Sequence, residues 1–174
     1  MKEKLMQMKS TMKENLHGKN IFLYACVFFG LLAFDLGTKA IADCFEPHFP
    51  VIKGFLHIDI THNTGAAFSF LGDKEWAMTF FIVLTVFVCI GLTVWLFCTS
   101  PKKVLLQLSI VFLISGAMGN FIDRVCLQFV RDFVNFPWFA NCNFADFFIT
   151  AGCVMLFVHL LFTDDEALFK PSHE

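Results

Sequence analysis

The sequence predicts an all-α membrane protein, with four transmembrane helices and a small extracytoplasmic β element. Hydrophobic residues make up 57% of the 174 residues, and the mean hydropathy is +0.67. Charged residues make up only 16%, against roughly 25% in a soluble domain. Four stretches also approach the roughly 20 apolar residues that a helix needs to cross a bilayer. No repeat or low-complexity linker interrupts them, so we expect one domain at residues 21–162.

The first predicted span covers residues 21–42 and follows a Lys-rich tail at residues 1–20. Its apolar core is long and the preceding tail is long, so we interpret it as an uncleaved helix and not as a cleaved signal peptide. Asp35 and Lys39 lie near its far end. The second predicted span, residues 76–98, contains mainly apolar residues and no Asp, Glu, Lys or Arg after Trp76.

The third and fourth predicted spans are residues 104–122 and 144–162, and an acidic C-terminal tail follows at 163–174. Asp146 lies in the first turn of the fourth span. An even number of spans places both termini on the same side of the membrane. The distribution of Lys and Arg indicates which side that is.

Lysines concentrate in the N-terminal tail and in the short link between the second and third spans. They are Lys2, Lys4, Lys9, Lys13 and Lys19 in the tail, and Lys102 and Lys103 in the link. The longer connections, about 43–75 and 123–143, carry Lys and Arg more sparsely. Both termini are therefore predicted to be cytoplasmic, with the longer connections outside. The tail lysines are most simply a solvated segment attracted to anionic lipid.

The first outer connection contains an alternating stretch, FLHIDITHN, at residues 55–63. Leu56, Ile58 and Ile60 alternate with polar residues, a pattern typical of a strand, and Gly65 follows at a turn. We expect a small β element that rests on the outer membrane surface.

The composition gives little reason to expect a cofactor, a metal or nucleic acid. The formal net charge is −2, and the seven cysteines form no CxxC pair or Cys/His metal spacing. Cys126 and Cys142 fall in one loop region and could pair in an oxidising space, but free thiols are favoured because the sequence does not fix their distance.

Polar residues gather at one predicted membrane face, which indicates a shared polar site. They are Asp35, Lys39, Asn63, Asn120, Asp123, Arg124, Asp132, Asn143 and Asp146. Ionisable residues at membrane depth are costly and usually face the protein interior or a wet cavity. A transporter more often places its binding acids near the midplane.

Several of these residues also have purely structural interpretations. Asp35 and Lys39 are spaced i, i+4, so a salt bridge is the favoured role. Asn120 and Asn143 are candidates for helix caps or backbone hydrogen-bond partners. Asp146 is favoured in a first helical turn by the helix dipole.

Asp123 and Arg124 are expected to end the third helix and to orient neighbouring groups. By itself Asp132 would be an ordinary loop acid. The short, aromatic-rich link FVNFPWFANCNFA, however, can bring Asp146 back toward it. Two neighbouring carboxylates in a low-dielectric site do not both ionise easily, so the pair can share a proton and supply one base and one acid. That is the chemistry of an aspartic protease.

Five motifs, in order along four spans, resemble lipoprotein signal peptidase, the signal peptidase II family. They are DLGTK (35–39), NTGAAFS (63–69), GNFIDR (119–124), VRDF (130–133) and NFADFFI (143–149). The resemblance covers residues 21–162 approximately.

The resemblance implies an aspartyl endopeptidase of the bacterial inner membrane whose active site lies at the outer face. Such enzymes remove the signal peptide from prolipoproteins that carry diacylglyceryl on the lipobox cysteine, and they cut just before that cysteine. The family's catalytic dyad maps onto Asp132 and Asp146. Positions that support the site or bind substrate map onto Asp35, Lys39, Asn63, Gly65, Asn120, Asp123, Arg124, Asn143 and Ala145.

The resemblance also implies partners. These are the prolipoprotein substrates, membrane lipid and the cyclic depsipeptide inhibitor globomycin, and we expect a monomer that needs no cofactor. The small residues around Gly65 would let a backbone approach closely, or simply form a tight turn.

Two positions depart from the family pattern. Arg131 stands where an apolar residue usually precedes the motif Asp, and Gln128 stands where Gly is frequent. Arg131 could lower the pKa of Asp132 if its side chain turned inward, but we expect it to point to water.

Three other functions compete with a peptidase. A four-span transporter or channel subunit is the main alternative, and a structural adaptor, which would lose no chemistry on Asp-to-Asn substitution, is the next. A metalloprotease has little support, because the sequence contains no HExxH.

Overall fold

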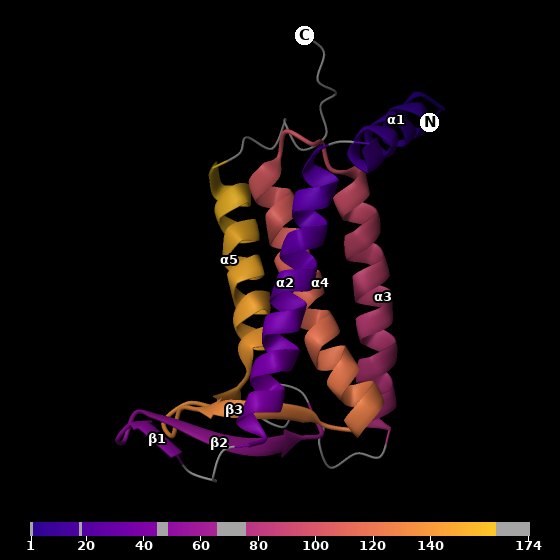
Figure 1. The fold of residues 1–174 in the computed structure, drawn as a ribbon. Coiled ribbons are helices and arrows are strands. Elements are labelled where there is room, and N and C mark those ends of the chain that lie inside the picture. The colour runs from indigo at the N-terminus through magenta and orange to yellow at the C-terminus, as the bar shows by residue number, and fades with distance from the viewer. Residues whose placement is uncertain (1, 18, 45–48, 66–75, 163–174) are drawn as a thin grey trace.

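The computed structural model describes residues 2–17, 19–44, 49–65 and 76–162, which form five helices and four strands (Figure 1). The helices are α1 (Lys2–His17), α2 (Lys19–Ala42), α3 (Ala77–Cys98), α4 (Val104–Leu127) and α5 (Phe144–Phe162). The strands are β1 (Phe49–Ile52), β2 (Leu56–Asn63), β3 (Val130–Asn135) and β4 (Asn141–Cys142).

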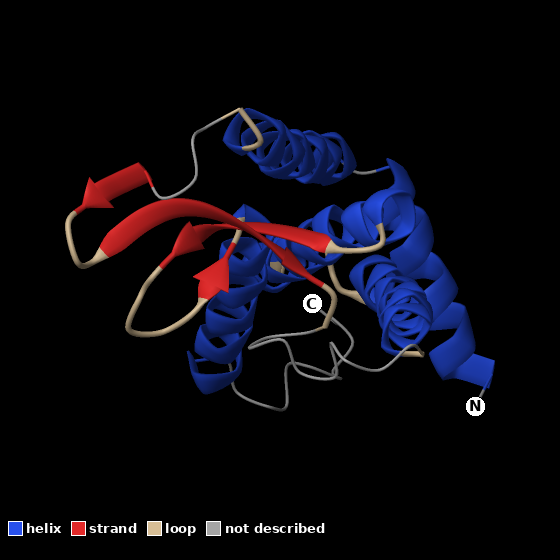
Figure 2. Cartoon of the chain, turned by 90° about the horizontal axis from the view of Figure 1, so that it is seen from below, coloured by secondary structure: helices blue, strands red, loops and turns tan. Residues whose placement is uncertain are grey.

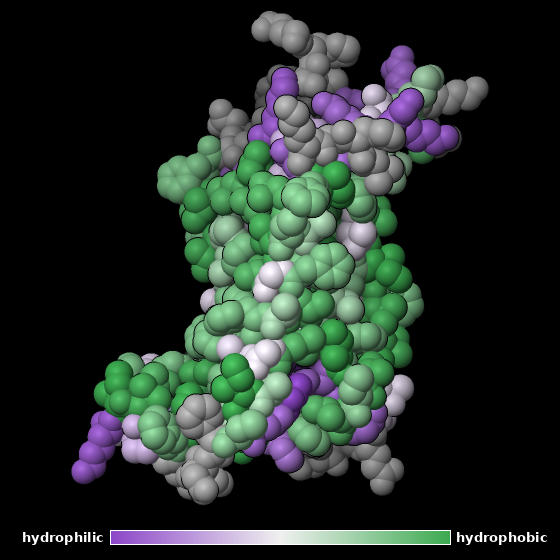
Figure 3. Space-filling model, in the orientation of Figure 1, coloured by the Kyte–Doolittle hydropathy of each residue, from purple (hydrophilic) through white to green (hydrophobic). Residues whose placement is uncertain are grey.

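Helices α2 to α5 form a bundle in which α4 is the most enclosed member (Figure 1). Each is long and apolar enough to span a membrane, which confirms the predicted four-span fold. Half of the most apolar window of α4 is buried, against 6% of that of α3, whose apolar side chains remain exposed. On the face shown in Figure 3, mainly apolar surface covers the middle of the bundle, and the strongly polar surface lies at its two ends. Such an apolar surface is what a hydrocarbon environment requires.

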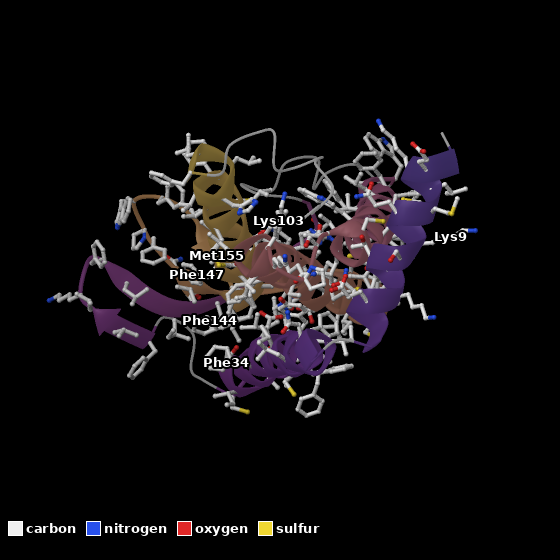
Figure 4. All side chains as sticks on the ribbon, turned by 90° about the horizontal axis from the view of Figure 1, so that it is seen from above. Lys9, Phe34, Lys103, Phe144, Phe147 and Met155 are labelled. Atoms are coloured by element: carbon white, nitrogen blue, oxygen red, sulfur yellow. The ribbon has the colours of Figure 1, made fainter. Side chains whose placement is uncertain are left out.

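Aromatic side chains contribute to the packing of α2 against α5. The rings of Phe34 and Phe144 lie 4.8 Å apart in an edge-to-face arrangement, and both are seen between the two helices in Figure 4. This contact lies at the end of the bundle that meets the sheet, one residue from Asp35 on one helix and two from Asp146 on the other.

The third predicted span ended too early. The helix continues five residues beyond Ile122 to Leu127, so Asp123 and Arg124 lie within its last turns. The apolar pattern stops at Ile122, but the backbone stays helical because Asp123 is buried and paired inside the protein. Gln128 ends the helix in a left-handed conformation with φ +67°, which glycine adopts with less strain.

The four strands form one antiparallel sheet in the order β1-β2-β3-β4 at one end of the bundle (Figure 2). Strand β2 confirms the strand predicted at residues 55–63, whereas β1, β3 and β4 were missed. Strand β3 is almost continuously buried, so it lacks the alternation that exposes a strand in a sequence. Phe133 and Val134 of β3 pack with Ala42 in a small core between the sheet and the helix ends.

Helix α1 was also missed, because residues 1–20 were interpreted as a solvated tail. It lies at the end of the bundle opposite the sheet (Figure 1). The predicted C-terminal tail, residues 163–174, lies outside the described residues.

Candidate active site

Asp146 is held at the N-terminus of α5 by a reciprocal cap. The backbone N–H of Asp146 donates to Asn143 Oδ1 at 3.1 Å, and the backbone N–H of Asn143 donates to Asp146 Oδ2 at 3.0 Å. This is a capping box, which satisfies two helix-terminal donors at once. The cap interpretation of Asn143 is therefore confirmed, and the carboxylate of Asp146 is fixed at the positive end of the helix dipole.

Asp132 comes from β3 and faces the same end of α5. Its residue pairs with Thr61 of β2, and its Oδ2 accepts a hydrogen bond from Asn63 Nδ2 at 2.9 Å. Its side chain is 3% exposed. Burial raises the pKa of Asp132 to about 6, against the lowering effect of the Asn63 hydrogen bond, and the charge of Asp146 adds to the increase. The negative charge of Asp146 therefore disfavours ionisation of Asp132.

Asn143 and Asn120 connect the two acids. Asn143 Nδ2 donates to Asp132 Oδ1 at 2.6 Å and to Asn120 Oδ1 at 3.1 Å. Asn120 Nδ2 donates to Asp146 Oδ1 at 2.9 Å. Two amides from α4 and the start of α5 therefore fix the orientation of both carboxylates, although the acids are 14 positions apart in the sequence.

Lys39 and Asp35 form a fully buried pair behind the acids. Lys39 Nζ lies 2.8 Å from Asp35 Oδ2, as their i, i+4 spacing predicted, and both side chains are 0% exposed. Lys39 also donates to Asn120 Oδ1 at 3.0 Å, and Asp35 Oδ1 accepts the backbone N–H of Ala145 at 2.8 Å. The pair is thus more than a salt bridge within one helix, because it orients Asn120 and caps α5.

Asp123 is bound by two cations, and this corrects the prediction that Arg131 points to water. Arg131 Nη2 lies 2.7 Å from Asp123 Oδ1, its backbone N–H donates to Asp123 Oδ2 at 3.0 Å, and Nη1 reaches Asp43 Oδ2 at 2.8 Å. Lys39 Nζ lies 3.5 Å from Asp123 Oδ2. Because neighbouring strand residues face opposite sides, Arg131 points away from Asp132 and toward the ends of α2 and α4.

Arg124 holds the turn that follows β2. Its Nη2 donates to the carbonyl oxygen of Gly65 at 3.0 Å, and its guanidinium lies 5.3 Å from the ring centre of Phe81 on α3. The backbone N–H of Gly65 donates to Asn63 Oδ1 at 2.9 Å, so the turn also orients the asparagine that binds Asp132. The rest of the NTGAAFS motif, residues 66–69, lies outside the described residues.

Glycines on α4 allow this site to form, and sequence reasoning missed them. A Cβ at Gly119 would overlap the carboxylate of Asp35, and one at Gly116 would overlap the carbonyl oxygen of Ala145. Helices α4 and α5 can therefore approach closely only because both positions are glycine. The i, i+3 spacing of Gly116 and Gly119 was the sequence feature that could have indicated this close helix contact.

In the part of the chain that the structure describes, no group of three His, Cys, Asp or Glu side chains could hold a metal ion. The seven cysteines are all free, including Cys126 and Cys142. The site is thus a cluster of four carboxylates, two amides bridging the acids and three cations. It brings Asp132 and Asp146, bridged by the two amides, together where the helical bundle meets the sheet.

Comparison with known proteins shows which family contains this chain. The sequence profile described as signal peptidase (SPase) II matches residues 27–162, which include every residue of the site. The chain belongs to the signal peptidase II family. The matched region contains all five motifs and both candidate acids. It also contains three of the four predicted spans in full and most of the first.

Individual relatives within signal peptidase II support the same assignment. A lipoprotein signal peptidase of Coxiella burnetii is 43% identical over 117 residues, covering 64% of this chain and 72% of that protein. One from Streptococcus pyogenes is 40% identical over 119 residues, covering 67% and 76%. A solved structure described as a bacterial membrane enzyme has a TM-score of 0.74 and 32% identity, covering 88% of this chain and 94% of that one. The protein is thus a multi-pass membrane protein of a peptidase family.

Proposed function

We propose that the protein is a membrane aspartyl endopeptidase that removes signal peptides from diacylglyceryl-modified prolipoproteins, cutting just before the lipidated cysteine. One observation carries the proposal. Asp132 and Asp146 arrive from β3 and α5 and are held by the same residue, Asn143, at 2.6 and 3.0 Å. The names of the relatives supply the substrate class.

The geometry supports an acid–base division of labour within the dyad. Buried Asp132, with its pKa raised to about 6, is suited to hold the shared proton. Asp146 accepts N–H donors from Asn120 and Asn143 at a helix N-terminus, so its carboxylate is held in a fixed orientation for the role of base. The pair nevertheless titrates as one coupled unit, and the proton belongs to both acids.

The reaction then follows the aspartic-protease scheme. The ionised carboxylate takes a proton from water, whose oxygen attacks the scissile carbonyl carbon while the protonated carboxyl gives its proton to the carbonyl oxygen. The tetrahedral intermediate collapses, the C–N bond breaks, and the amine of the lipidated cysteine leaves with a proton returned by the dyad. Every proton moves between the two acids, water and the peptide.

The position of the dyad fits a lipid-anchored substrate. Asp132 lies on β3 and Asp146 in the first turn of α5, and these elements adjoin where the bundle meets the sheet (Figure 1). Acyl chains would hold a lipidated cysteine at such a boundary. With cytoplasmic termini, as the lysine distribution predicts, this end faces the outer side of the bacterial inner membrane. Asn63, Gly65 and Arg124 border Asp132 from the side of the following loop and are suited to bind the substrate backbone.

The test uses the purified full chain in detergent or liposomes with a diacylglyceryl-modified prolipopeptide. We expect cleavage before the lipidated cysteine by the wild type and none above background by Asp132→Asn or Asp146→Asn. Glu14→Gln, the same carboxylate-to-amide change at the far end of the molecule, should keep wild-type activity. Globomycin should inhibit, and light scattering should report a monomer.

Three outcomes would contradict the proposal. Cleavage that survives both single Asp-to-Asn changes would remove the aspartyl mechanism. Inhibition of the wild type by a chelator, reversed by added metal, would favour metal chemistry. A folded wild-type protein that neither cleaves the lipopeptide nor binds globomycin would favour the transporter or adaptor function.

A further inference from the structure

Helix α1 carries one continuous face that divides into two parts. Leu5, Met8, Met12 and Asn15 follow one another at spacings of three and four, so they lie on the same side of the helix. Along this face, exposure increases toward the N-terminus. Asn15 is 8% exposed, Met12 is half-buried, Met8 is 41% exposed and Leu5 is 49% exposed.

The C-terminal part of this face is docked on the bundle by a buried hydrogen-bond network. Asn15 Nδ2 donates to the carbonyl oxygens of Phe97 and Thr99 at 2.8 and 2.7 Å. These carbonyls belong to the end of α3, where a helix leaves acceptors without partners. Asn15 Oδ1 accepts Gln107 Nε2 at 3.1 Å, and Gln107 Oε1 accepts the Tyr24 hydroxyl at 2.8 Å. The network joins α1 to α2, α3 and α4 and fixes which side of α1 faces the bundle.

The N-terminal part continues beyond the edge of the bundle. Figure 1 shows α1 extending past α3 at the end opposite the sheet. Leu5 and Met8 therefore point in the same direction as docked Asn15, but the described residues leave both of them exposed. At the end of an apolar bundle, that direction leads toward the bilayer.

Cations flank this uncovered stripe. Lys4 lies on one side of it and Lys9 and Lys13 on the other, and all three side chains are exposed. Lys9 points away from the bundle in Figure 4. Long lysine side chains can lie along apolar surface and place their ammonium groups at the level of lipid phosphates. An apolar stripe with lysines on both flanks is typical of a helix that lies in the membrane interface.

We propose that α1 is an interfacial helix that binds anionic phospholipid at the end of the bundle opposite the active site. Leu5 and Met8 enter the acyl boundary, and Lys4, Lys9 and Lys13 bind the headgroup phosphates. The occupant is lipid and not another protein, because the stripe is narrow, cationic at its flanks and directed toward the bilayer. Helix α1 precedes the family-matched residues 27–162, so this surface is a feature of this chain outside the region matched to signal peptidase II.

Amide hydrogen exchange of the full chain in nanodiscs tests the proposal, with one protein copy per disc. We expect residues 3–9 to exchange about tenfold more slowly in discs that contain phosphatidylglycerol than in discs of phosphatidylcholine alone, because each lysine near an anionic surface contributes. High salt should remove the difference. The triple variant Lys4→Gln/Lys9→Gln/Lys13→Gln should also remove it, without changing exchange in the four spans.

Matched variants distinguish the effect of the α1 lysines on lipid binding from the effect of the Asn15 contact that docks α1 on the bundle. Lys53→Gln removes one positive charge at the β1–β2 turn, at the other end of the molecule, and should leave the lipid dependence of α1 unchanged. Asn15→Ala should accelerate exchange of α1 in both lipids. Equal exchange of α1 in the two kinds of disc would overturn the proposal, as would a lipid dependence that persists in the triple variant. Protection that appears only with two copies per disc would assign the stripe to a protein contact instead.

Discussion

At the scale of single residues, amides decide what the two acids can do. Asn143 contacts both carboxylates, Asn63 contacts Asp132, and Asn120 contacts Asp146. An amide can donate to a carboxylate whether or not a proton is present, so the acids keep their orientation while the proton moves. The amides also adjust acidity, since a donor to a carboxylate stabilises its ionised form.

Removing one amide should therefore shift the pH dependence of cleavage. If Asp132 carries the shared proton, kcat/KM of the wild type should fall as the pH rises through about 6, because Asp132 then loses its proton. The hydrogen bond from Asn63 lowers the pKa of Asp132. In Asn63→Ala that pKa rises, so the alkaline limb should move to higher pH even if maximal activity falls. A pH–rate profile that keeps its alkaline limb in place would show that Asp132 does not hold the proton.

Arg131 offers a second residue-scale prediction. Its contact with Asp123 is bidentate and buried on the Asp123 side, whereas its partner Asp43 has a side chain 45% exposed. Arg131→Gln should lower the free energy of unfolding by about 2 kcal/mol, since it removes charge-assisted hydrogen bonds to a buried carboxylate. Asp43→Asn should change it by less than about 1 kcal/mol, because solvent screens an exposed pair. Denaturation of both variants in detergent measures the free energy of unfolding. Equal losses in the two variants would contradict the larger contribution assigned to the Arg131–Asp123 contact.

At the scale of elements, the close approach of α4 and α5 brings Asn120 within reach of Asp146. Gly116 and Gly119 on α4 face Ala145 and Asp35, and Gly152 on α5 faces Leu113 and Ser109. Small residues at such contacts let helix backbones approach in a membrane. A slightly larger separation would break the hydrogen bond between Asn120 and Asp146 while leaving both helices intact.

A methyl group added at this helix contact should lower stability and cleavage activity, and the loss should increase with its steric overlap. Gly119→Ala should destabilise the fold by about 1–3 kcal/mol through overpacking, and it should reduce cleavage further, because its Cβ would meet the Asp35 carboxylate that caps α5. Gly91→Ala on α3 is the matched control, since nothing lies within 4 Å of the added Cβ. It should stay within about 1 kcal/mol of the wild type. Thermal unfolding and cleavage rates measure both, and an unaffected Gly119→Ala would refute the close contact.

At the scale of the whole molecule, one lysine connects the spans. Lys39 from α2 contacts Asp123 and Asn120 of α4 and, through Asp35, the first turn of α5. A buried ammonium of this kind is costly to desolvate and is stable only while its acidic partners surround it. Three of the four spans are thus fixed relative to one another by the same group that orients the active-site amide.

Removing the charge of Lys39 alone should therefore destabilise the fold more than removing the charges of Asp35 and Lys39 together. Lys39→Met leaves Asp35 buried without a cation, and we expect a loss of about 3–5 kcal/mol. Asp35→Asn/Lys39→Met should lose less, because the amide introduced at position 35 can still accept the Ala145 N–H and Asp123 keeps Arg131. Unfolding midpoints of the single and double variants decide this. A double variant that is less stable than Lys39→Met would contradict a charge-pair origin.

The sequence by itself determined the four spans, the strand at β2, the Asp35–Lys39 pair and the family, including the two candidate acids. These features depend on local pattern or on motif residues. Length and hydropathy report a membrane helix directly, and an i, i+4 pair is fixed by helix geometry.

Only the tertiary structure decided how the site is held together. The roles of Asn120 and Asn143 as bridges, the pairing of Arg131 with Asp123, the glycine contact of α4 with α5 and the docking of α1 through Asn15 all join residues far apart in the chain or on different elements. No local pattern records which face of one element meets another. Such contacts are set by packing of the whole bundle against the sheet, because each buried polar group must find its partner there.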